Sequence, residues 1–472
     1  MLRAATLAAL VAAAPSAAVP PAGEAYEETP IVLSAAARLP PEKLAGERHR
    51  VLERVENDGF MNHWRIESDW GEFAADSDHL LEVRLREFNA LAQLEEVTRS
   101  QAFLDALERA FTGPWKAARQ VVEQPVAAAK RVPDGVARMF RRKKRQVRDL
   151  AEEAREEYRE LKREIEERRA ARDAEEAERA AASADAGAGA EAGAEAEDPD
   201  AERAAREQRR AEALDEAKEV AGDVGDEAKR YFQRKSGYRK ARRDWAKLLG
   251  VDPYGDNEAL NRELFRVAAA SAVGGFSARL VPVPRIPGLS ELGDVHDLVY
   301  QLDALDLRLR NEKILAELGF DRSVWDPLYD NRAWNGTLLT ELVDALERLR
   351  AVDNHRLLVL RALAAATRDE ARFLAAGASH YAALHEGALP LAGFIERDEV
   401  VAARTAAGPV VVALAVDRLA WTETWAELWE GALPRLVAAG DGRVELHLRG
   451  ESSPELARHT AEQGVRLLAR SF

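Results

Sequence analysis

Apolar residues recur three and four positions apart over most of the chain. The segments with this spacing are residues 80–97, 101–111, 258–272, 295–318, 338–349, 356–366 and 368–385. Such spacing gathers apolar side chains on one face of a helix, which must then pack against a neighbour. The pattern therefore predicts helices near the N-terminus and a helical domain over residues 236–390.

A different pattern, the alternation typical of strands, marks the region before the first helix. Residues 63–68 and 72–75 alternate in this way on either side of Asp69-Trp70-Gly71, whose glycine can adopt a positive φ angle. We expect a β-hairpin here. An isolated hairpin is only marginally stable, so the helices that follow should pack beside it.

The last part of the chain also favours strands. Residues 400–405 and 410–416 are β-rich runs separated by a Gly-Pro turn, and residues 444–448 and 465–468 read as two further strands. The first two runs should form a hairpin. We expect a small α/β module over residues 391–472.

Two helix starts are expected inside this module. Thr424 and Glu427 have the spacing of a capping box, and Ser453-Pro454 is typical of a helix N-terminus. One option is that the N-terminal hairpin joins the sheet of this module. In that case the middle of the chain would be an insertion rather than a linker.

The overall prediction is a mainly α fold with a small α+β part, in which helical domains are separated by a charged helical and disordered middle. A chain of 472 residues is too long for one ordinary core. The predicted units are a signal peptide (1–18), an extended leader (19–48), an N-terminal hairpin plus helical domain (49–138), a charged coiled-coil-like helix (139–181), a disordered acidic low-complexity linker (182–200), a charged helix (201–235), a helical domain (236–390) and the α/β module (391–472).

The predictions for the middle of the chain are based on its composition and on the spacing of its apolar residues. Residues 147–165 place apolar side chains four and three apart in a Glu/Arg-rich stretch, which is the spacing of a coiled-coil seam. Residues 182–200 contain Ala, Gly and acidic residues but no large apolar side chain. Such a segment buries too little surface to offset its chain entropy, so we expect disorder.

Charge is divided unevenly along the chain. The net charge is −15, yet residues 111–148 carry eleven Lys or Arg against Glu123 and Asp134. Apolar positions in this stretch recur at intervals close to eleven residues. A cationic amphipathic segment of this kind can lie on an anionic membrane surface. The residues predicted to make that contact are Lys130, Arg131, Arg138, Arg141, Arg142, Lys143, Lys144 and Arg145.

The same charge has other interpretations, which stay open at this point. The apolar stripe can pack on the N-terminal helices, and the cations can face the acidic residues that follow Asp149. A nucleic-acid contact needs similar charge. We expect a protein or an anionic membrane surface, rather than nucleic acid, as the partner.

The first residues predict export. Met1-Leu2-Arg3, an Ala-rich apolar stretch and Pro15-Ser16-Ala17-Ala18 have the order of a signal peptide cleaved near Ala18, so we expect a periplasmic or extracellular protein. The chain has no cysteine, which excludes disulfides, thiolate metal sites and a catalytic thiol. No later apolar run approaches the ~18–20 residues of a membrane span, so no transmembrane helix is expected.

Two stretches of the sequence carry a family resemblance. Residues 65–73 (RIESDWGEF) and 245–254 (WAKLLGVDPY) resemble those of an uncharacterised exported bacterial protein family with no assigned activity. The likeness covers most of the chain outside the middle. It implies no catalytic residues for this sequence.

Candidate catalytic groups have simpler structural interpretations. Asp294, His296 and Asp297 could bind a metal or move protons, but Asp294 is also suited to cap a helix. His380 and His385 are five apart and do not form the zinc spacing His-Glu-x-x-His. We therefore predict no metal, no cofactor and no assigned catalytic residue.

Two further motifs also favour structure over chemistry. Asn335-Gly336-Thr337 matches a glycosylation acceptor, although so short a pattern arises by chance. Trp421, Trp425 and Trp429 recur every four residues and should form one buried helical stripe.

These observations favour a non-enzymatic, exported envelope protein of structural or interaction type that touches an anionic surface through its basic stretch. The alternative is a hydrolase-like or metal-assisted enzyme whose site is assembled only in three dimensions. A pocket joining His296 to other carboxylates would favour that alternative. The oligomeric state is left open by the sequence.

Overall fold

The structure is a computed structural model that describes residues 26–100, 103, 136, 139, 226–274, 294–387, 389–397 and 400–470. The predicted signal peptide and the linker at 182–200 lie outside these residues, as does nearly all of the predicted coiled-coil-like helix. Within the described part, no helix is both long enough and apolar enough to cross a membrane.

The N-terminal part is built on a curled antiparallel sheet. Its strands are β1 (Ile31–Ser34), β2 (His49–Val51), β3 (Arg54–Asn57), β4 (Asn62–Ser68) and β5 (Gly71–Ala75), with two short helices, α1 (Ala35–Arg38) and α2 (Pro41–Leu44), between β1 and β2. β4 lies at its centre and pairs with β3, β2 and β5, while β1 pairs with β3. The β4–β5 hairpin is the predicted one, with Gly71 at a φ of 115°. β1 lies within the segment predicted as a leader.

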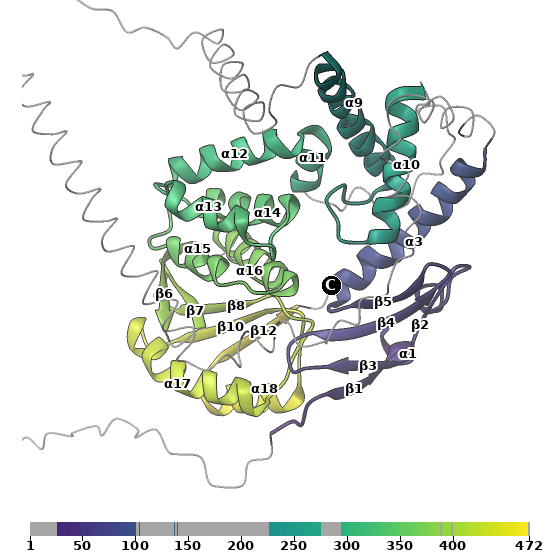
Figure 1. Cartoon of the computed structure of the whole chain (residues 1–472). Coiled ribbons are helices and arrows are strands. Elements are labelled where there is room, and N and C mark those ends of the chain that lie inside the picture. The colour runs from purple at the N-terminus through teal and green to yellow at the C-terminus, as the bar shows by residue number, and fades with distance from the viewer. Residues whose placement is uncertain are drawn as a thin grey trace, which may run out of the picture.

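Three long helices share the core of this sheet, and the first of them packs directly on β4 and β5. They are α3 (Asp78–Arg99), α9 (Asp226–Leu249) and α10 (Glu258–Gly274) (Figure 1). The N-terminal core joins Trp64 of β4 and Phe88 of α3 to Trp245 of α9 and Leu264 of α10. Residues on either side of positions 104–225 therefore belong to one core.

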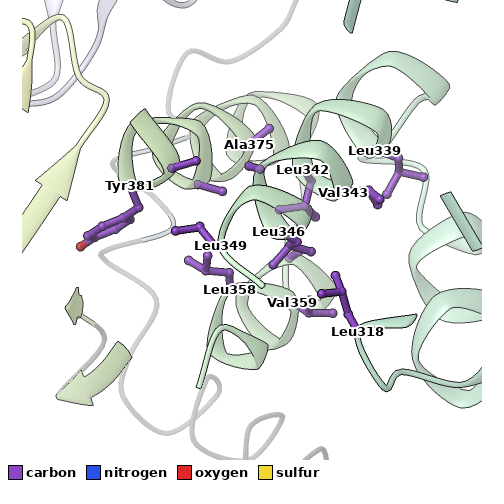
Figure 2. Packing of buried hydrophobic residues seen from close by; sticks show 14 of the residues in the cluster. Leu318, Leu339, Leu342, Val343, Leu346, Leu349, Leu358, Val359, Ala375 and Tyr381 are labelled. Atoms are coloured by element: carbon purple, nitrogen blue, oxygen red, sulfur yellow. The ribbon is translucent and has the colours of Figure 1, made fainter. Parts of the chain in front are cut away.

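A second, wholly helical layer follows. Its helices are α11 (Asp294–Gln301), α12 (Ala304–Glu317), α13 (Arg322–Asp330), α14 (Gly336–Arg348), α15 (Arg356–Leu363) and α16 (Arg368–Glu386). Figure 2 shows Leu342 and Leu346 of α14 facing Leu358 and Val359 of α15, with Ala375 of α16 close by. These side chains belong to the middle core, which also includes residues of the strands that follow. Their packing confirms the helical spacing in this region.

The C-terminal module contains a mixed five-stranded sheet. Its strands are β6 (Leu391–Arg397), β7 (Val400–Thr405), β8 (Val410–Leu414), β10 (Val444–Arg449) and β12 (Arg466–Arg470), in the spatial order β12-β10-β8-β7-β6. The predicted hairpin is β7–β8, and β8, β10 and β12 run parallel. The helices α17 (Glu423–Ala439) and α18 (Pro454–Glu462) connect the parallel strands, and two short strands, β9 (Arg418–Leu419) and β11 (Glu451–Ser452), pair beside them.

Of the two helix starts predicted for this module, one is confirmed and the other is wrong. Ser453 caps α18 by accepting a hydrogen bond from the Leu456 amide, as predicted. The predicted capping box at Thr424 is wrong, because Thr422 is the N-cap of α17 and accepts from the Trp425 amide. Thr424 lies inside the first turn.

The prediction of a mainly α fold is wrong. The described residues are 55% helical and 20% strand and include two five-stranded sheets, so the fold is not clearly mainly α. Part of this sheet content could not be predicted from the sequence, because strands β1, β2 and β3 are only three or four residues long. β8 is buried at every position and so shows no alternation.

The two sheets are separate, so the N-terminal hairpin does not join the C-terminal sheet. They nevertheless meet where the β3–β4 connection reaches the β8–β9 connection. The Phe60 carbonyl accepts hydrogen bonds from the amides of Asp417 (3.1 Å) and Arg418 (3.2 Å), and the Phe60 ring packs edge-on against Trp425. The Asp417 carboxylate in turn accepts from the amides of Asn62 (2.9 Å) and Asp78 (3.0 Å). We call this contact the Phe60 joint.

Candidate functional site

Only two residues of the basic segment predicted to contact an anionic surface are described, and both are apolar. The predicted contact residues themselves, Lys130 to Arg145 as named above, lie outside the described residues. Val136 and Met139, which stand among them in the sequence, are described. Val136 is 2% exposed and Met139 is partly buried, and both pack against the C-terminal core.

The surroundings of Val136 decide between two interpretations of the apolar stripe at this point. The C-terminal core contains Phe373 of α16, Val400 of β7 and Trp425 of α17, and it contains no residue of α3. At Val136 the stripe therefore packs on the C-terminal module rather than on the N-terminal helices. A side chain buried in this core is also unavailable to enter a lipid bilayer.

A second group of polar residues is linked by the electrostatic influence of Arg449 on Glu341 and His380. Val444, Leu446 and Leu448 of β10 face the C-terminal core, so the alternating residues of this strand face the opposite side. That side carries Val411 and Ala413 of β8, which pack in the middle core. We define the strand-end cluster as Glu341 of α14, His380 of α16, His447 and Arg449 of β10, and Arg470 of β12.

Two members of the strand-end cluster have strongly shifted pKa values. Burial, followed by the charge of Asp252, raises the pKa of Glu341 to about 7, against the attraction of Arg372 and Arg449. Burial, followed by the positive charges of Arg449 and His447, lowers the pKa of His380 to about 4. Perturbed carboxylates and imidazoles that converge from separate elements are typical of functional sites.

Sequence reasoning missed most of this cluster. His380 entered only through its spacing to His385, and Glu341, Arg449 and Arg470 belong to no motif. The positions are far apart in the chain, so no local pattern could have joined them. His385 has a structural role, because its Nδ1 accepts a hydrogen bond from the Leu391 amide (3.0 Å).

A buried ion network lies between the N-terminal and middle parts. Arg84 of α3 contacts Glu87 (2.7 Å) and Asp256 (2.8 Å), and Arg372 of α16 contacts the other oxygen of Asp256 (2.8 Å). Burial alone would raise the pKa of Asp256, but the charges of Arg372 and Arg84 outweigh it and hold that pKa far below its usual range. Both carboxylate oxygens of Asp256 are paired with arginines, one on α3 and one on α16. The network therefore links these two helices.

A second buried group supports the Phe60 joint. His63 lies between Asp76 (Nδ1–Oδ1, 2.9 Å) and Asp58 (Nε2–Oδ2, 3.3 Å). Burial alone would lower the pKa of His63, yet the two carboxylates raise it to about 10. Asp58 also accepts from the amides of Phe60 and Met61 and so shapes the connection that docks on the C-terminal module.

The remaining candidates from the sequence have structural roles or are not described. α11 begins at Asp294, and the side chains of Asp294 and His296 lie outside the described part. Asn335 caps α14 by accepting from the Leu338 amide. Trp421, Trp425 and Trp429 are fully buried in the C-terminal core, as predicted. Only Trp425 and Trp429 form a helical stripe, because Trp421 precedes Thr422, the N-cap of α17, and stacks on His459 of α18.

Among the described residues, no group of three or more His, Cys, Asp or Glu side chains has a geometry that could hold a metal ion. No protein-family model, curated protein or solved structure matches this chain.

Proposed function

We propose that this chain is an exported envelope protein of structural or interaction type, which contacts an anionic membrane surface through the basic segment at residues 130–145. The observation that carries this proposal is the burial of Val136 in the C-terminal core. It ties the basic segment to a folded module. The local charge, positive within a chain of net −15, supplies the attraction.

The burial of Val136 also favours one mode of contact. An interfacial amphipathic helix binds by inserting its apolar face, whereas a segment whose apolar residues pack on its own protein must bind by charge. Binding by charge weakens as salt screens the surface. The proposed contact is therefore electrostatic and reversible.

Flotation with vesicles of phosphatidylglycerol and phosphatidylcholine tests this proposal. In the test variant the eight residues Lys130, Arg131, Arg138, Arg141, Arg142, Lys143, Lys144 and Arg145 are replaced by Gln, and we expect it to lose flotation at low salt. The matched control replaces eight exposed basic residues elsewhere, namely Lys43, Arg50, Arg54, Arg99, Arg308, Arg350, Arg443 and Arg458. This control has the same net charge as the test variant and should float like the unmodified protein. Equal behaviour of the two variants would refute a role specific to the segment.

Export itself is part of the proposal and has a separate test. A variant lacking residues 1–18 should stay in the bacterial cytoplasm, while the full chain should reach the periplasm or medium. Identical fractionation of the two proteins would contradict it.

The hydrolase-like alternative has one supporting observation, which is that the charge of Arg449 acts on both Glu341 of α14 and His380 of α16. A carboxyl group with a pKa near 7 is suited to general acid–base work. If the protein is such an enzyme, Glu341→Gln should abolish turnover of whatever ester or amide substrate a hydrolase screen detects. Retained turnover in that variant would remove this support.

A further inference from the structure

The segment that leads into β1 reaches across to the C-terminal module. The Glu27 amide donates a hydrogen bond to the Trp421 carbonyl (2.9 Å), and the Trp421 amide donates to the Glu27 carboxylate (2.8 Å). The Ser453 hydroxyl donates to the same carboxylate oxygen. We call residues 26–30 the N-terminal strap, because they run from this contact to the first strand of the other sheet.

The Glu27 carboxylate lies where two helices begin. Trp421 directly precedes Thr422, the N-cap of α17, and Ser453 is the N-cap of α18. Helix N-termini carry partial positive charge, so a carboxylate beside both of them is stabilised. One Glu27 side chain therefore ties the starts of α17 and α18 to each other and to the strap.

The two helix starts also contact each other directly. The Trp421 ring stacks on the His459 ring of α18, with 4.3 Å between the ring centroids. The Ser453 amide donates a hydrogen bond to the Leu419 carbonyl (2.9 Å). Movement of one helix start therefore disturbs the other, so the two should open as a unit.

Two unpaired donors destabilise the closed arrangement at this end of the module. The indole N–H groups of Trp421 and Trp425 are buried and, within the described structure, have no hydrogen-bond partner. A buried donor without a partner costs free energy that is recovered when water reaches it. The contacts of Glu27 act against this tendency to open.

The strap is anchored through Glu27, which is partly buried, whereas the other four residues of the strap are exposed. A segment held in this way opens locally at a fraction of the free energy of global unfolding. The backbone just before Trp421 is held separately, because the Ala420 amide donates to the Gly59 carbonyl (3.0 Å). We propose that the strap is a reversible clasp: when the contacts of Glu27 break, the starts of α17 and α18 open while the sheet stays folded. The clasp does not depend on the proposed function, since none of its groups belongs to the basic segment.

Hydrogen exchange of the full-length protein, followed by mass spectrometry, tests the clasp. Glu27→Ala removes the carboxylate, so amide exchange in residues 421–426 and 456–460 should become about tenfold faster or more, as expected for the loss of hydrogen bonds to a charged group. Exchange in residues 410–414 and 444–449, which form β8 and β10, should stay unchanged. These strands also report that the variant is folded.

Glu28→Ala is the matched control, because Glu28 is the neighbouring glutamate and is exposed. It makes the same change of charge and should exchange like the unmodified protein. The proposal is overturned if Glu27→Ala and Glu28→Ala exchange alike. It is also overturned if exchange in β8 and β10 rises as much as at the helix starts, because Glu27 would then stabilise the whole module rather than a local closure.

A double-mutant cycle tests the link from Glu27 to α18. Ser453→Ala removes the hydroxyl that donates to Glu27, and it also removes the cap of α18, so it should speed exchange in residues 456–460 by itself. Because the hydroxyl is the link, Glu27→Ala should change exchange in these residues much less in the Ser453→Ala background than in the unmodified protein. Equal effects in the two backgrounds would show that Glu27 does not act on α18 and would overturn the joint opening of the two helices.

Discussion

Replacing His63 with Gln should destabilise the protein in a way that depends on pH. His63 is 9% exposed and lies between the carboxylates of Asp58 and Asp76. Gln has no positive charge, so the variant leaves two buried carboxylates without their cation. Breaking a buried charge pair on one side is among the costlier single substitutions.

The size of the effect follows from the pKa of His63. That pKa is about 10 in the folded protein, compared with the ordinary histidine value of 6.5. The folded-state pKa is raised, so the stabilisation is fully present below about pH 6.5 and is lost as pH rises through about 10. At about 1.4 kcal/mol per pKa unit the ceiling is about 5 kcal/mol, of which about 4 remains at pH 7 and about 1.5 at pH 9.

Urea unfolding followed by circular dichroism measures this difference. The free energy of unfolding of the unmodified protein should exceed that of His63→Gln by several kcal/mol at about pH 7 and by much less at about pH 9. The Phe60 joint should loosen in the variant as well, because Asp58 shapes that connection. A gap between the two proteins that is the same at both pH values would refute the reasoning.

Three further substitutions test packing, and urea unfolding measures each. Gly450→Ala should cost about 3 kcal/mol or more, because Gly450 has a φ of 149° and an added Cβ would lie 1.7 Å from the Val416 carbonyl oxygen. Tyr381→Phe should cost about 1–3 kcal/mol, because the hydroxyl donates to the Val401 carbonyl (2.8 Å) and accepts from the Ala413 amide (2.9 Å), both within the sheet. Arg84→Met should cost about 3–5 kcal/mol by leaving buried carboxylates unpaired.

Each of these has an outcome that would contradict it. Gly442→Ala is the control for Gly450→Ala, because Gly442 also has a positive φ (92°) but its added Cβ would meet nothing within 4 Å. Equal losses in the two glycine variants would show that backbone conformation alone matters. An unchanged midpoint for Tyr381→Phe would show that the two hydrogen bonds of this hydroxyl do not stabilise the fold. A stable Arg84→Met variant would show that the ion network is dispensable.

Local signals in the sequence predicted local structure well. Gly71 marked the β4–β5 turn, Ser453-Pro454 marked the start of α18, and the recurrence of tryptophan marked buried side chains, two of which, Trp425 and Trp429, lie on α17. Each of these depends on residues within one or two turns of chain. The Thr424 prediction was wrong because Thr422 has the same side-chain chemistry and lies two positions earlier.

Long-range features were not predictable in this way. β1 is four residues long and pairs with β3 across two short helices, so its place in a sheet is set by tertiary contacts. The charge of Arg449 acts on both Glu341 and His380 only because α14 packs on α16 and α16 lies over β8. No spacing rule connects them, and their shifted pKa values arise from burial and from charges that the fold brings near.

The central claim is that the basic segment acts by charge while Val136 and Met139 stay packed on the C-terminal module. Flotation with anionic vesicles over a range of sodium chloride, from about 0.02 to about 0.5 M, tests it most directly. We predict that binding is strong at the low end and is lost at the high end. Binding that persists at high salt would indicate insertion of apolar side chains into the bilayer. That result would contradict a contact made by charge.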